Sequence, residues 1–469
     1  MPAYSARKIR KFLNSAASTA FSDTSPASGA FCATRNTEPG AQIGLTELAK
    51  KGGLYLTFRY GLSVLVSLGN MLVMTWWIGP HAYGIFVTAV GLTTFLASLS
   101  RFGVDTYLIR CESTPGERDY HVAATLVLTI STASLLLGAL GVPLLVRWFA
   151  QPEFALPYLA LLATVPLTAL VGIPIAKLER ELNFRAVAGI ELAGQLSAFA
   201  IALILAQRGL AVWAPVCGMV AWQIVVFCSA CRLSGFSTRC AWDVATARRM
   251  VVFGSGFTLS SRAWQLRTLV NPLVVGRLGG PEAVAFIAFA VRIAEGLSFV
   301  RTATGRLAIA GLAKLQSDPP RFRAALEEGL RLQVLLLGPL LCAFALAGPW
   351  LMPRFMGERW TPALGIYPFV AIAVLVNSVF SLQASALFVL QRQAAVVWAY
   401  CSHVALLAGA TFLLLPRFGI VGYGCAELFA CSAYLFIPFK LSQLAAISYT
   451  RLLPWLAVFS LPLVLQAMY

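Results

Sequence analysis

Long runs of apolar residues, separated by short polar segments, follow one another along almost the whole chain. About 20 apolar residues are enough to carry a helix across a bilayer, whereas a β-barrel would show short strands of alternating polarity. The pattern therefore predicts an all-α polytopic membrane protein with twelve spans. They fall at about residues 54–78, 83–100, 122–146, 155–176, 187–206, 210–231, 251–277, 283–300, 332–352, 363–390, 394–415 and 420–439.

A thirteenth apolar run, at about residues 452–468, is weaker than the others. It is short and carries Pro454 and Pro462, and proline interrupts the backbone hydrogen bonding of a helix. Two interpretations stay open for residues 441–469: an extra C-terminal span, or a segment that lies at the membrane surface.

The charge supports the membrane assignment and gives it a direction. Only 12% of the 469 residues are charged, about half of what soluble domains carry. The net charge of +17 comes from Lys and Arg in short loops, which indicates the positive-inside rule and argues against a nucleic-acid partner. Alternate loops hold about 26 basic residues on the side of the N-terminus and about six on the other. We therefore expect a cytoplasmic N-terminus.

The N-terminal segment and the cysteines indicate no signal peptide, disulfide framework or metal site. Residues 1–46 are polar, with no apolar core long enough for a signal peptide, so we predict a disordered cytoplasmic tail; an organellar transit peptide is the alternative. The ten cysteines form no disulfide or metal framework, and Cys228 and Cys231 are best explained as packing residues. No metal site and no cofactor are expected.

The chain also repeats itself, which predicts its domain organisation. Residues 76–91 resemble residues 276–292, with Gly79-Pro80 corresponding to Gly280-Pro281, and residues 206–218 resemble 415–427. The offset of about 200–210 residues predicts two six-helix bundles, 47–240 and 241–440, as parallel repeats in the same orientation. In transporters built this way the substrate binds between the halves.

A cytoplasmic segment, residues 301–331, is expected to link the bundles as a helix. After Pro319 and Pro320 its pattern is amphipathic, with Phe322, Leu326 and Leu330 on one face. The helix is expected to lie along the membrane surface with its arginines near anionic headgroups, or to be a solvated connection.

Four arginines fall inside predicted spans, where a charge costs at least about 2.5–3.5 kcal/mol and marks a cavity or pathway. These candidates for a cationic, substrate-binding cavity are Arg59, Arg262, Arg267 and Arg292. Arg262 shares a helix face with Thr258, Ser261 and Gln265, whereas Arg267 lies on another side, as a residue that holds helices together would. Arg59 is near enough to the cytoplasmic end to reach the headgroups instead, and Arg292 could pair with Glu295.

Two carboxylates lie inside spans as well. Glu191 and Glu427 are candidates for coupling transport to a proton or sodium gradient. The alternative is that each carboxyl group is hydrogen-bonded to a neighbouring helix. The sequence shows no nucleotide-binding loop and no nucleophile–base set, so transport driven by ATP within this chain is not expected.

Several segments together resemble the Wzx-like polysaccharide flippases of the multidrug/oligosaccharidyl-lipid/polysaccharide (MOP) exporter superfamily. They are IGPHAYGIF after the first span, KLERELNFRAVAGIELAGQ at 177–195, GLAVWAPVCG at 209–218, LAKLQSDPPRFR at 312–323 and FMGERWTPA at 355–363. Their order covers residues 47 to about 440. The resemblance implies a V-shaped pair of bundles in the bacterial inner membrane that flips an undecaprenyl-pyrophosphate-linked oligosaccharide by alternating access through a cationic cavity. Membrane lipids and the lipid-linked oligosaccharide are the implied partners, with a polysaccharide polymerase or chain-length machinery as a candidate.

Two other functions are weighed against this one. A cation-coupled multidrug extruder of the same superfamily would need a cavity dominated by carboxylates and apolar walls, whereas the charges here are mostly arginines. A polysaccharide polymerase or ligase would need a large outer loop with catalytic side chains, and every predicted outer loop is short. The sequence therefore favours a non-enzymatic flippase.

Overall fold

The chain is helical throughout the residues that the structure describes. The computed structural model describes residues 39–111, 114–299, 301, 311–443 and 447–468, with side chains from residue 69 onward except 255–264 and 468. Every regular element within these ranges is a helix, and none of them is a strand. A helix satisfies its own backbone hydrogen bonds, as a lipid environment requires. The predicted all-α class is confirmed. Contacts divide the chain into Met1–Tyr60 and Gly61–Tyr469, and the side-chain contacts described lie within the second unit.

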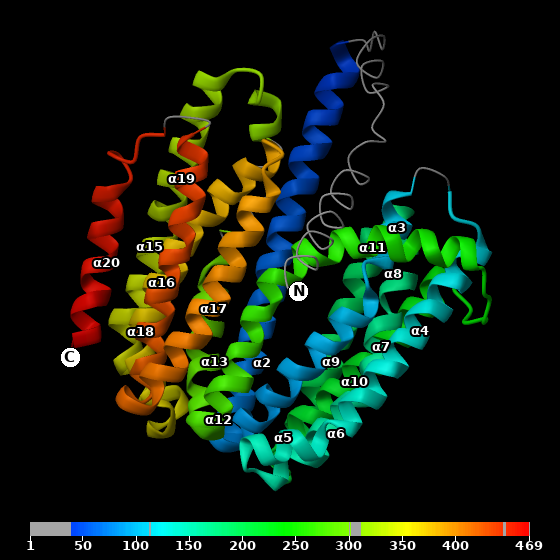
Figure 1. The fold of residues 1–469 in the computed structure, drawn as a ribbon, viewed down its shortest axis with the longest axis horizontal. Coiled ribbons are helices and arrows are strands. Elements are labelled where there is room, and N and C mark those ends of the chain that lie inside the picture. The colour runs from blue at the N-terminus through cyan, green and yellow to red at the C-terminus, as the bar shows by residue number, and fades with distance from the viewer. Residues whose placement is uncertain (1–38, 112–113, 300, 302–310, 444–446, 469) are drawn as a thin grey trace, which may run out of the picture. The chain divides into compact units, whose positions relative to one another are not determined.

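The first group of helices runs from α2 to α10. Helices α4 to α10 lie together (Figure 1). The bounds are α2 (Pro39–Arg101), α3 (Val104–Arg110), α4 (Glu117–Leu140), α5 (Val142–Phe149), α6 (Ala155–Leu162), α7 (Val165–Leu170), α8 (Gly172–Arg180), α9 (Phe184–Gln207) and α10 (Trp213–Ser234), with a 3₁₀ turn η1 (Pro152–Phe154) before α6.

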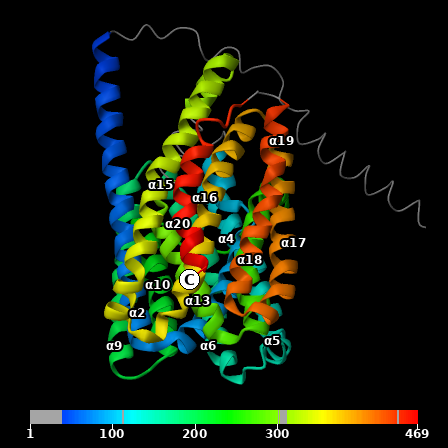
Figure 2. The same cartoon turned by 90° about the vertical axis from the view of Figure 1, so that its left-hand side faces the viewer.

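The second group runs from α11 to α20, and α15 to α20 lie together in both views (Figures 1 and 2). The α-helices are α11 (Val244–Gln265), α12 (Gly276–Leu278), α13 (Gly280–Leu297), α15 (Pro319–Met356), α16 (Pro362–Val389), α17 (Gln393–Phe418), α18 (Ile420–Ala430), α19 (Phe436–Ser442) and α20 (Leu453–Met468). Shorter segments are the 3₁₀ helices η2 (Leu266–Leu269), η4 (Glu358–Trp360) and η5 (Cys431–Leu435), and the π-helix η3 (Asn271–Val275).

Several helices begin where a short polar side chain caps them. Asn183 accepts a hydrogen bond from the Ala186 amide at the start of α9, at 3.2 Å. Asp243 does the same for α11 and Asp318 for α15, at 2.9 and 3.2 Å. Each cap satisfies one of the amides that the first turn of a helix leaves unpaired.

Nine helical stretches in the described residues are long and apolar enough to cross a membrane. The first and second predicted spans run together as α2, with a break at Gly79, where φ is 73° and ψ is 170°. The seventh is divided into short segments, and α13 carries three charged residues. The chain is therefore a multi-pass membrane protein, and the number twelve stays a prediction.

The outer surfaces of these helices fit a lipid environment. Large apolar side chains are widely exposed on α4, α15 and α17: Leu140 is 79% exposed, Leu346 75% and Trp398 68%. Apolar patches of this extent are rare on soluble monomers and mark a surface that another apolar phase covers. Here the covering phase is the acyl region of the bilayer.

The predicted repeat has a counterpart in the backbone. Non-helical residues with positive φ recur about 200–210 residues apart: Gly79 with Gly280, Ala150 with Gly357, Leu182 with Gln391, and Gly209 with Gly419. Left-handed φ is unusual outside glycine, so four matched positions indicate that the same turns are built twice. The bundle boundary near residue 240 stays a prediction.

The two repeated Gly-Pro turns lie against each other at a close backbone contact. A Cβ on Gly84, one turn after Pro80, would lie 1.8 Å from the Pro281 carbonyl oxygen. Farther along α2, a Cβ on Gly91 would lie 3.2 Å from Pro272 Cγ. Only glycine permits the approach of α2 to α13 at Gly84, whereas the contact with η3 at Gly91 is tight but less restrictive.

Helix α15 corrects one prediction. Its 38 residues run without a break from Pro319 to Met356, so the amphipathic segment continues directly into the ninth span. Phe322, Leu326 and Leu330 are 3%, 1% and 1% exposed and belong to the hydrophobic core of the second group of helices. The expectation that this face lies on the membrane surface is wrong, because protein side chains cover it.

The thirteenth apolar run forms helix α20, which lies along α15 and α16 (Figure 2). Gln466 Nε2 donates to the Ala345 carbonyl at 2.6 Å, and the Cys342 thiol donates to the Phe459 carbonyl at 3.2 Å. Its 16 residues span about 24 Å, a little less than the apolar thickness of a bilayer. The segment packs beside the spans, as an additional membrane helix would.

Candidate functional site

The seventh predicted span is interrupted near its middle, and Arg267 lies at the interruption. Helix α11 gives way to the 3₁₀ helix η2, which holds Arg267, and then to the π-helix η3. Pro272 removes one backbone donor from η3, and Asn271 Nδ2 reaches the Val284 carbonyl of α13 at 3.3 Å. A change of helix type within a span commonly marks a hinge or a functional site.

The twelfth predicted span is interrupted too, beside Glu427. Helix α18 ends at Ala430, the 3₁₀ helix η5 follows, and α19 resumes at Phe436. His403 of α17 lies 3.0 Å through Nδ1 from the Ala430 carbonyl, which places the ring proton on that nitrogen. The imidazole stacks on Tyr434, with centroids 4.6 Å apart.

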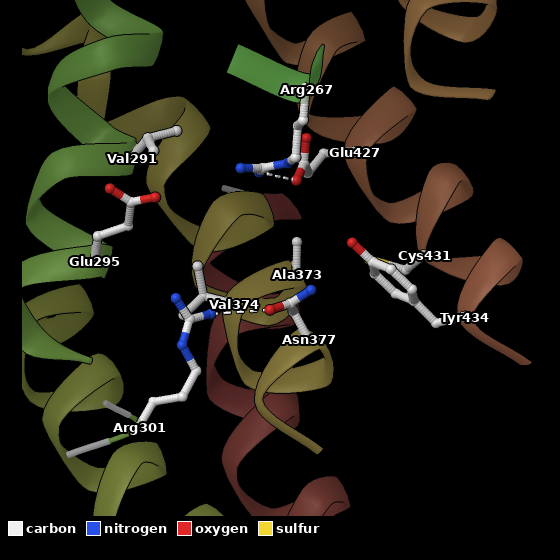
Figure 3. A pocket seen from close by; sticks show the side chains of 10 residues that line it. All are labelled: Arg267, Val291, Glu295, Arg301, Ala373, Val374, Asn377, Glu427, Cys431 and Tyr434. Atoms are coloured by element: carbon white, nitrogen blue, oxygen red, sulfur yellow. Dashed lines mark hydrogen bonds and ion pairs between the residues drawn. The ribbon is translucent and has the colours of Figure 1, made fainter. Parts of the chain in front are cut away.

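Arg267 and Glu427 join these two interruptions through a buried ion pair. The guanidinium donates through a terminal nitrogen to Oε1 of the carboxylate (Figure 3). The Arg267 side chain is 15% exposed and the Glu427 side chain 4%. Taking either charge alone out of water costs several kcal/mol, so each compensates the other.

A small cavity adjoins the pair, and a second arginine lines it. Arg301, which follows α13, donates to Asn377 Oδ1 of α16 at 2.9 Å, and the Glu295 carboxylate faces the same space (Figure 3). The cavity volume of about 20 Å³ accommodates about one water molecule. It is lined by Arg267, Val291, Glu295, Arg301, Ala373, Val374, Asn377, Glu427, Cys431 and Tyr434. Two guanidinium groups and two carboxylates thus meet in a space too small for a sugar.

The structure brings together two of the six predicted site residues. Arg267 and Glu427 form the pair described above, whereas Glu191 is exposed on α9. The backbone of Arg59 belongs to α2 and that of Arg262 to α11, but both side chains lie outside the described residues.

Arg292, the remaining predicted site residue, is exposed on α13. Both Arg292 and Glu295 are described, and no ion pair joins them in this part of the chain. The alternative that Glu295 holds Arg292 therefore has no ion pair to support it. The guanidinium is accessible to a ligand.

Arg301 and Asn377 are site residues that the sequence analysis missed. Arg301 was placed in the cytoplasmic segment 301–331, and neutral Asn377 has no charge to attract notice inside a long apolar run. A signal does exist, because Ser298 and Arg301 repeat the spacing of Ser98 and Arg101 at the end of the second span. Arg101 likewise reaches across its own group of helices, to the Thr168 carbonyl at 2.9 Å.

The charged groups of α2 to α10 are arranged differently. Arg180 donates to the carbonyls of Leu108 and Cys111, at 2.8 and 3.1 Å, and so ties α8 to the end of α3. Lys177 pairs with Glu117 at 2.8 Å, with the carboxylate 64% exposed. These contacts join helix ends. Among the described residues, no group of three or more His, Cys, Asp or Glu side chains could hold a metal ion.

Comparisons with known proteins place the fold. A family described as polysaccharide biosynthesis protein matches residues 73–365. None of the curated proteins matches the chain. The structure of the lipid II flippase MurJ in an inward closed conformation is similar, with a TM-score of 0.72 at 13% identity, covering 88% of this chain and 97% of that one.

Two further solved structures share the architecture. An inward-facing multidrug resistance MATE family transporter of the MOP superfamily gives a TM-score of 0.63 at 13% identity, covering 82% of this chain and 98% of that one. A MOP superfamily transporter from Pyrococcus furiosus gives 0.53 at 12% identity, covering 84% and 96%. At such identities the similarity establishes the fold, which is that of MOP-type transporters.

Proposed function

The chain belongs to the polysaccharide biosynthesis protein family, and we propose that it flips an undecaprenyl-pyrophosphate-linked oligosaccharide across the bacterial inner membrane. The product would serve O-antigen, capsule or exopolysaccharide synthesis. The transporter works by alternating access, with its N-terminus in the cytoplasm. Its fold, that of MOP-type transporters, supports a transporter rather than an enzyme.

The observation that carries this proposal is the placement of arginine side chains among membrane-embedded helices. A sugar diphosphate loses its water when it enters hydrocarbon, at a cost of several kcal/mol for each unpaired polar group. Arginine stays charged in such surroundings and donates paired hydrogen bonds to phosphate. Arg267 and Arg301 line one cavity, and Arg292 is accessible on α13 beside it.

These arginines divide into two roles in our proposal. Arg292 and Arg262 contact the diphosphate first, because Arg292 carries no carboxylate partner among the described residues. Arg267 and Arg301 become available when the cavity opens, and Arg59 contributes from the first span. Glu191 and Glu427 are our candidates for coupling the cycle to an ion gradient.

The cavity beside the ion pair is too small for the substrate, so the diphosphate can reach Arg267 and Arg301 only when this cavity opens. At about 20 Å³ it holds a water molecule, whereas a sugar diphosphate needs a cleft of several hundred Å³. The 3₁₀ segments η2 and η5 interrupt the seventh and twelfth predicted spans, and the backbone can move at these places. Discontinuous helices have the same role at the binding sites of other transporters.

Deletion of the gene tests the proposal in cells. The null strain is expected to accumulate lipid-linked repeat units at the cytoplasmic face and to lose its surface polysaccharide, and the wild-type gene restores both. Normal surface glycan in the null strain, with no redundant transporter encoded, would contradict the proposal. Loss of dye efflux in the same strain would favour a multidrug extruder instead.

A further inference from the structure

We propose that Glu427 is an internal counter-anion: it occupies Arg267 in the empty transporter, and the phosphates of the substrate displace it during loading. The inference rests on the proposed function and adds a role for the ion pair within the transport cycle. The role does not require Glu427 to change its protonation state.

Arg267 needs a neutralising anion in every state of the transport cycle. Its side chain is 15% exposed and lies at the interruption of a membrane-embedded helix. An unpaired guanidinium there would carry an uncompensated desolvation cost. A carrier that has released its substrate must return without that cost, and Glu427, which pairs with Arg267, can supply the neutralising charge.

A phosphate and Glu427 cannot occupy Arg267 together. Carboxylate and phosphate oxygens use the same guanidinium donors. The neighbouring cavity, at about 20 Å³, leaves room for one water molecule and not for a phosphate group. Loading therefore requires the carboxylate to leave.

The Arg267–Glu427 pair borders the water-sized cavity on the carboxylate side. Among the described residues, Glu427 Oε2 and the Tyr434 hydroxyl are buried without a protein hydrogen-bond partner, and both residues line the water-sized cavity. A permanent structural ion pair in low dielectric gains its stability from satisfying every such atom. Polar atoms that bond to water rather than to protein can change partners when an incoming anion replaces that water.

A second arginine, Arg301, faces the cavity in which an incoming anion would replace Glu427. Arg301 and Asn377 line the opposite side of the same cavity, and Arg301 donates to the neutral amide oxygen of Asn377 (Figure 3). An amide oxygen is a weaker acceptor for a guanidinium than a phosphate is. When the cavity opens, Arg267 and Arg301 can each take one phosphate of the diphosphate.

This assignment predicts that substrate binding and carrier return respond in opposite directions when the charge of Glu427 is removed. In Glu427→Gln, Arg267 has no competing anion, so the diphosphate binds more tightly. The empty state loses its counter-anion, so its return becomes slow. Net flipping should fall strongly, while exchange of labelled substrate between two loaded leaflets, which needs no empty return, should persist.

Binding of inorganic pyrophosphate to the purified full chain, measured by calorimetry, is the test. We expect Glu427→Gln to bind about tenfold more tightly than wild type, and the double variant Arg267→Gln/Glu427→Gln to lose this gain. Glu358→Gln, an exposed carboxylate in η4, is the matched control and should bind as wild type. Should Glu427→Gln not purify as folded protein, Glu427→Asp, which withdraws the carboxylate by one methylene, should show a smaller gain.

Binding by Glu427→Gln, or by Glu427→Asp in its place, that is no tighter than that of wild type would overturn the counter-anion role. That result is separable from failure of the proposed function. If wild type restores surface glycan to the null strain but the Glu427 variant shows no gain, only the counter-anion role is contradicted. If wild type does not restore it, the flippase assignment itself is contradicted.

Discussion

The two groups of helices, α2 to α10 and α11 to α20, share their turns but differ in where their charged side chains lie. Matched left-handed residues, such as Leu182 and Gln391, show that the backbone is built alike in both. In the first group, arginines near helix ends bind backbone carbonyls, as Arg180 does at Leu108. In the second group, Arg267 and Glu427 form a buried ion pair between two interrupted helices.

The two groups of helices therefore use their charged side chains in different ways. Contacts of arginine with carbonyls fix the ends of helices, as Arg180 fixes the end of α3. A buried ion pair at interrupted helices costs stability to maintain and offers charged groups to a ligand. The second group is therefore the better candidate for binding a charged substrate. The first group is the better candidate for supporting the movement of helices during transport.

The largest expected effect concerns export. Arg292→Ala and Arg262→Ala should each abolish surface polysaccharide while the protein stays in the membrane, because the diphosphate loses a guanidinium contact. Arg292→Lys should rescue export in part, since lysine keeps the charge but not the paired donors. Immunoblots of membranes and surface-glycan staining measure both quantities.

Arg417→Ala is the matched control for this prediction. Arg417 is exposed at the end of α17, on the side expected to be extracytoplasmic, and export should stay at the wild-type level. Wild-type export by both Arg292→Ala and Arg262→Ala would remove these arginines from the site.

Next in size is the stability difference between the ion pairs of the two groups. Arg267→Ala leaves Glu427 buried and unpaired and should lower the free energy of unfolding by about 3–5 kcal/mol. Lys177→Ala, whose partner Glu117 is mostly exposed, should cost less than about 1 kcal/mol. Unfolding in detergent, followed by circular dichroism, measures both losses. Similar small losses in the two variants would contradict a larger stability contribution from the buried ion pair.

Alanine substitutions at the close contacts of α2 should lower stability to different degrees. Gly84→Ala places a methyl group against the Pro281 carbonyl oxygen, which belongs to the backbone and cannot move aside alone. A loss of about 1–3 kcal/mol is expected, as for other overpacked sites. Gly91→Ala meets only the Pro272 ring at 3.2 Å and should cost less. Equal losses of stability in the two variants, measured by thermal unfolding, would contradict a closer contact at Gly84 than at Gly91.

The smallest effect tests whether the repeat is built alike at a single residue. Leu182 and Gln391 have φ of 58° and 57°, a conformation that disfavours residues other than glycine and asparagine. Leu182→Asn and Gln391→Asn should therefore each stabilise the protein by about 0.5–1 kcal/mol. A gain at only one of the two, in matched unfolding curves, would argue against equivalent turns.

Much of the architecture was predictable because lipid imposes simple rules on the sequence. Apolar runs predicted the helices, and the similarity of the Gly79-Pro80 and Gly280-Pro281 segments predicted a repeat that the backbone φ angles support. The resemblance to MOP-superfamily flippases is confirmed at the level of family and fold. The continuous helix α15 was missed because an amphipathic face looks alike whether lipid or protein covers it.

The site was harder to predict than the fold. Arg267, Arg292 and Glu427 stand out in apolar sequence because they are charged. Their pairing depends on where the seventh and twelfth spans are interrupted, and local sequence does not determine whether a proline-containing span kinks or becomes a 3₁₀ or π segment. Arg301 lies at the end of an apolar run, where an arginine ordinarily faces the cytoplasm.

Flipping by the purified protein is the most direct test of the central claim. The full chain is reconstituted in liposomes that carry a fluorescent, undecaprenyl-pyrophosphate-linked oligosaccharide, and a membrane-impermeant quencher reports the leaflet in which the label resides. The account predicts protein-dependent transfer between leaflets, lost in Arg292→Ala and retained in Arg417→Ala. Transfer no faster than in protein-free liposomes, by wild-type protein that is folded, would contradict it.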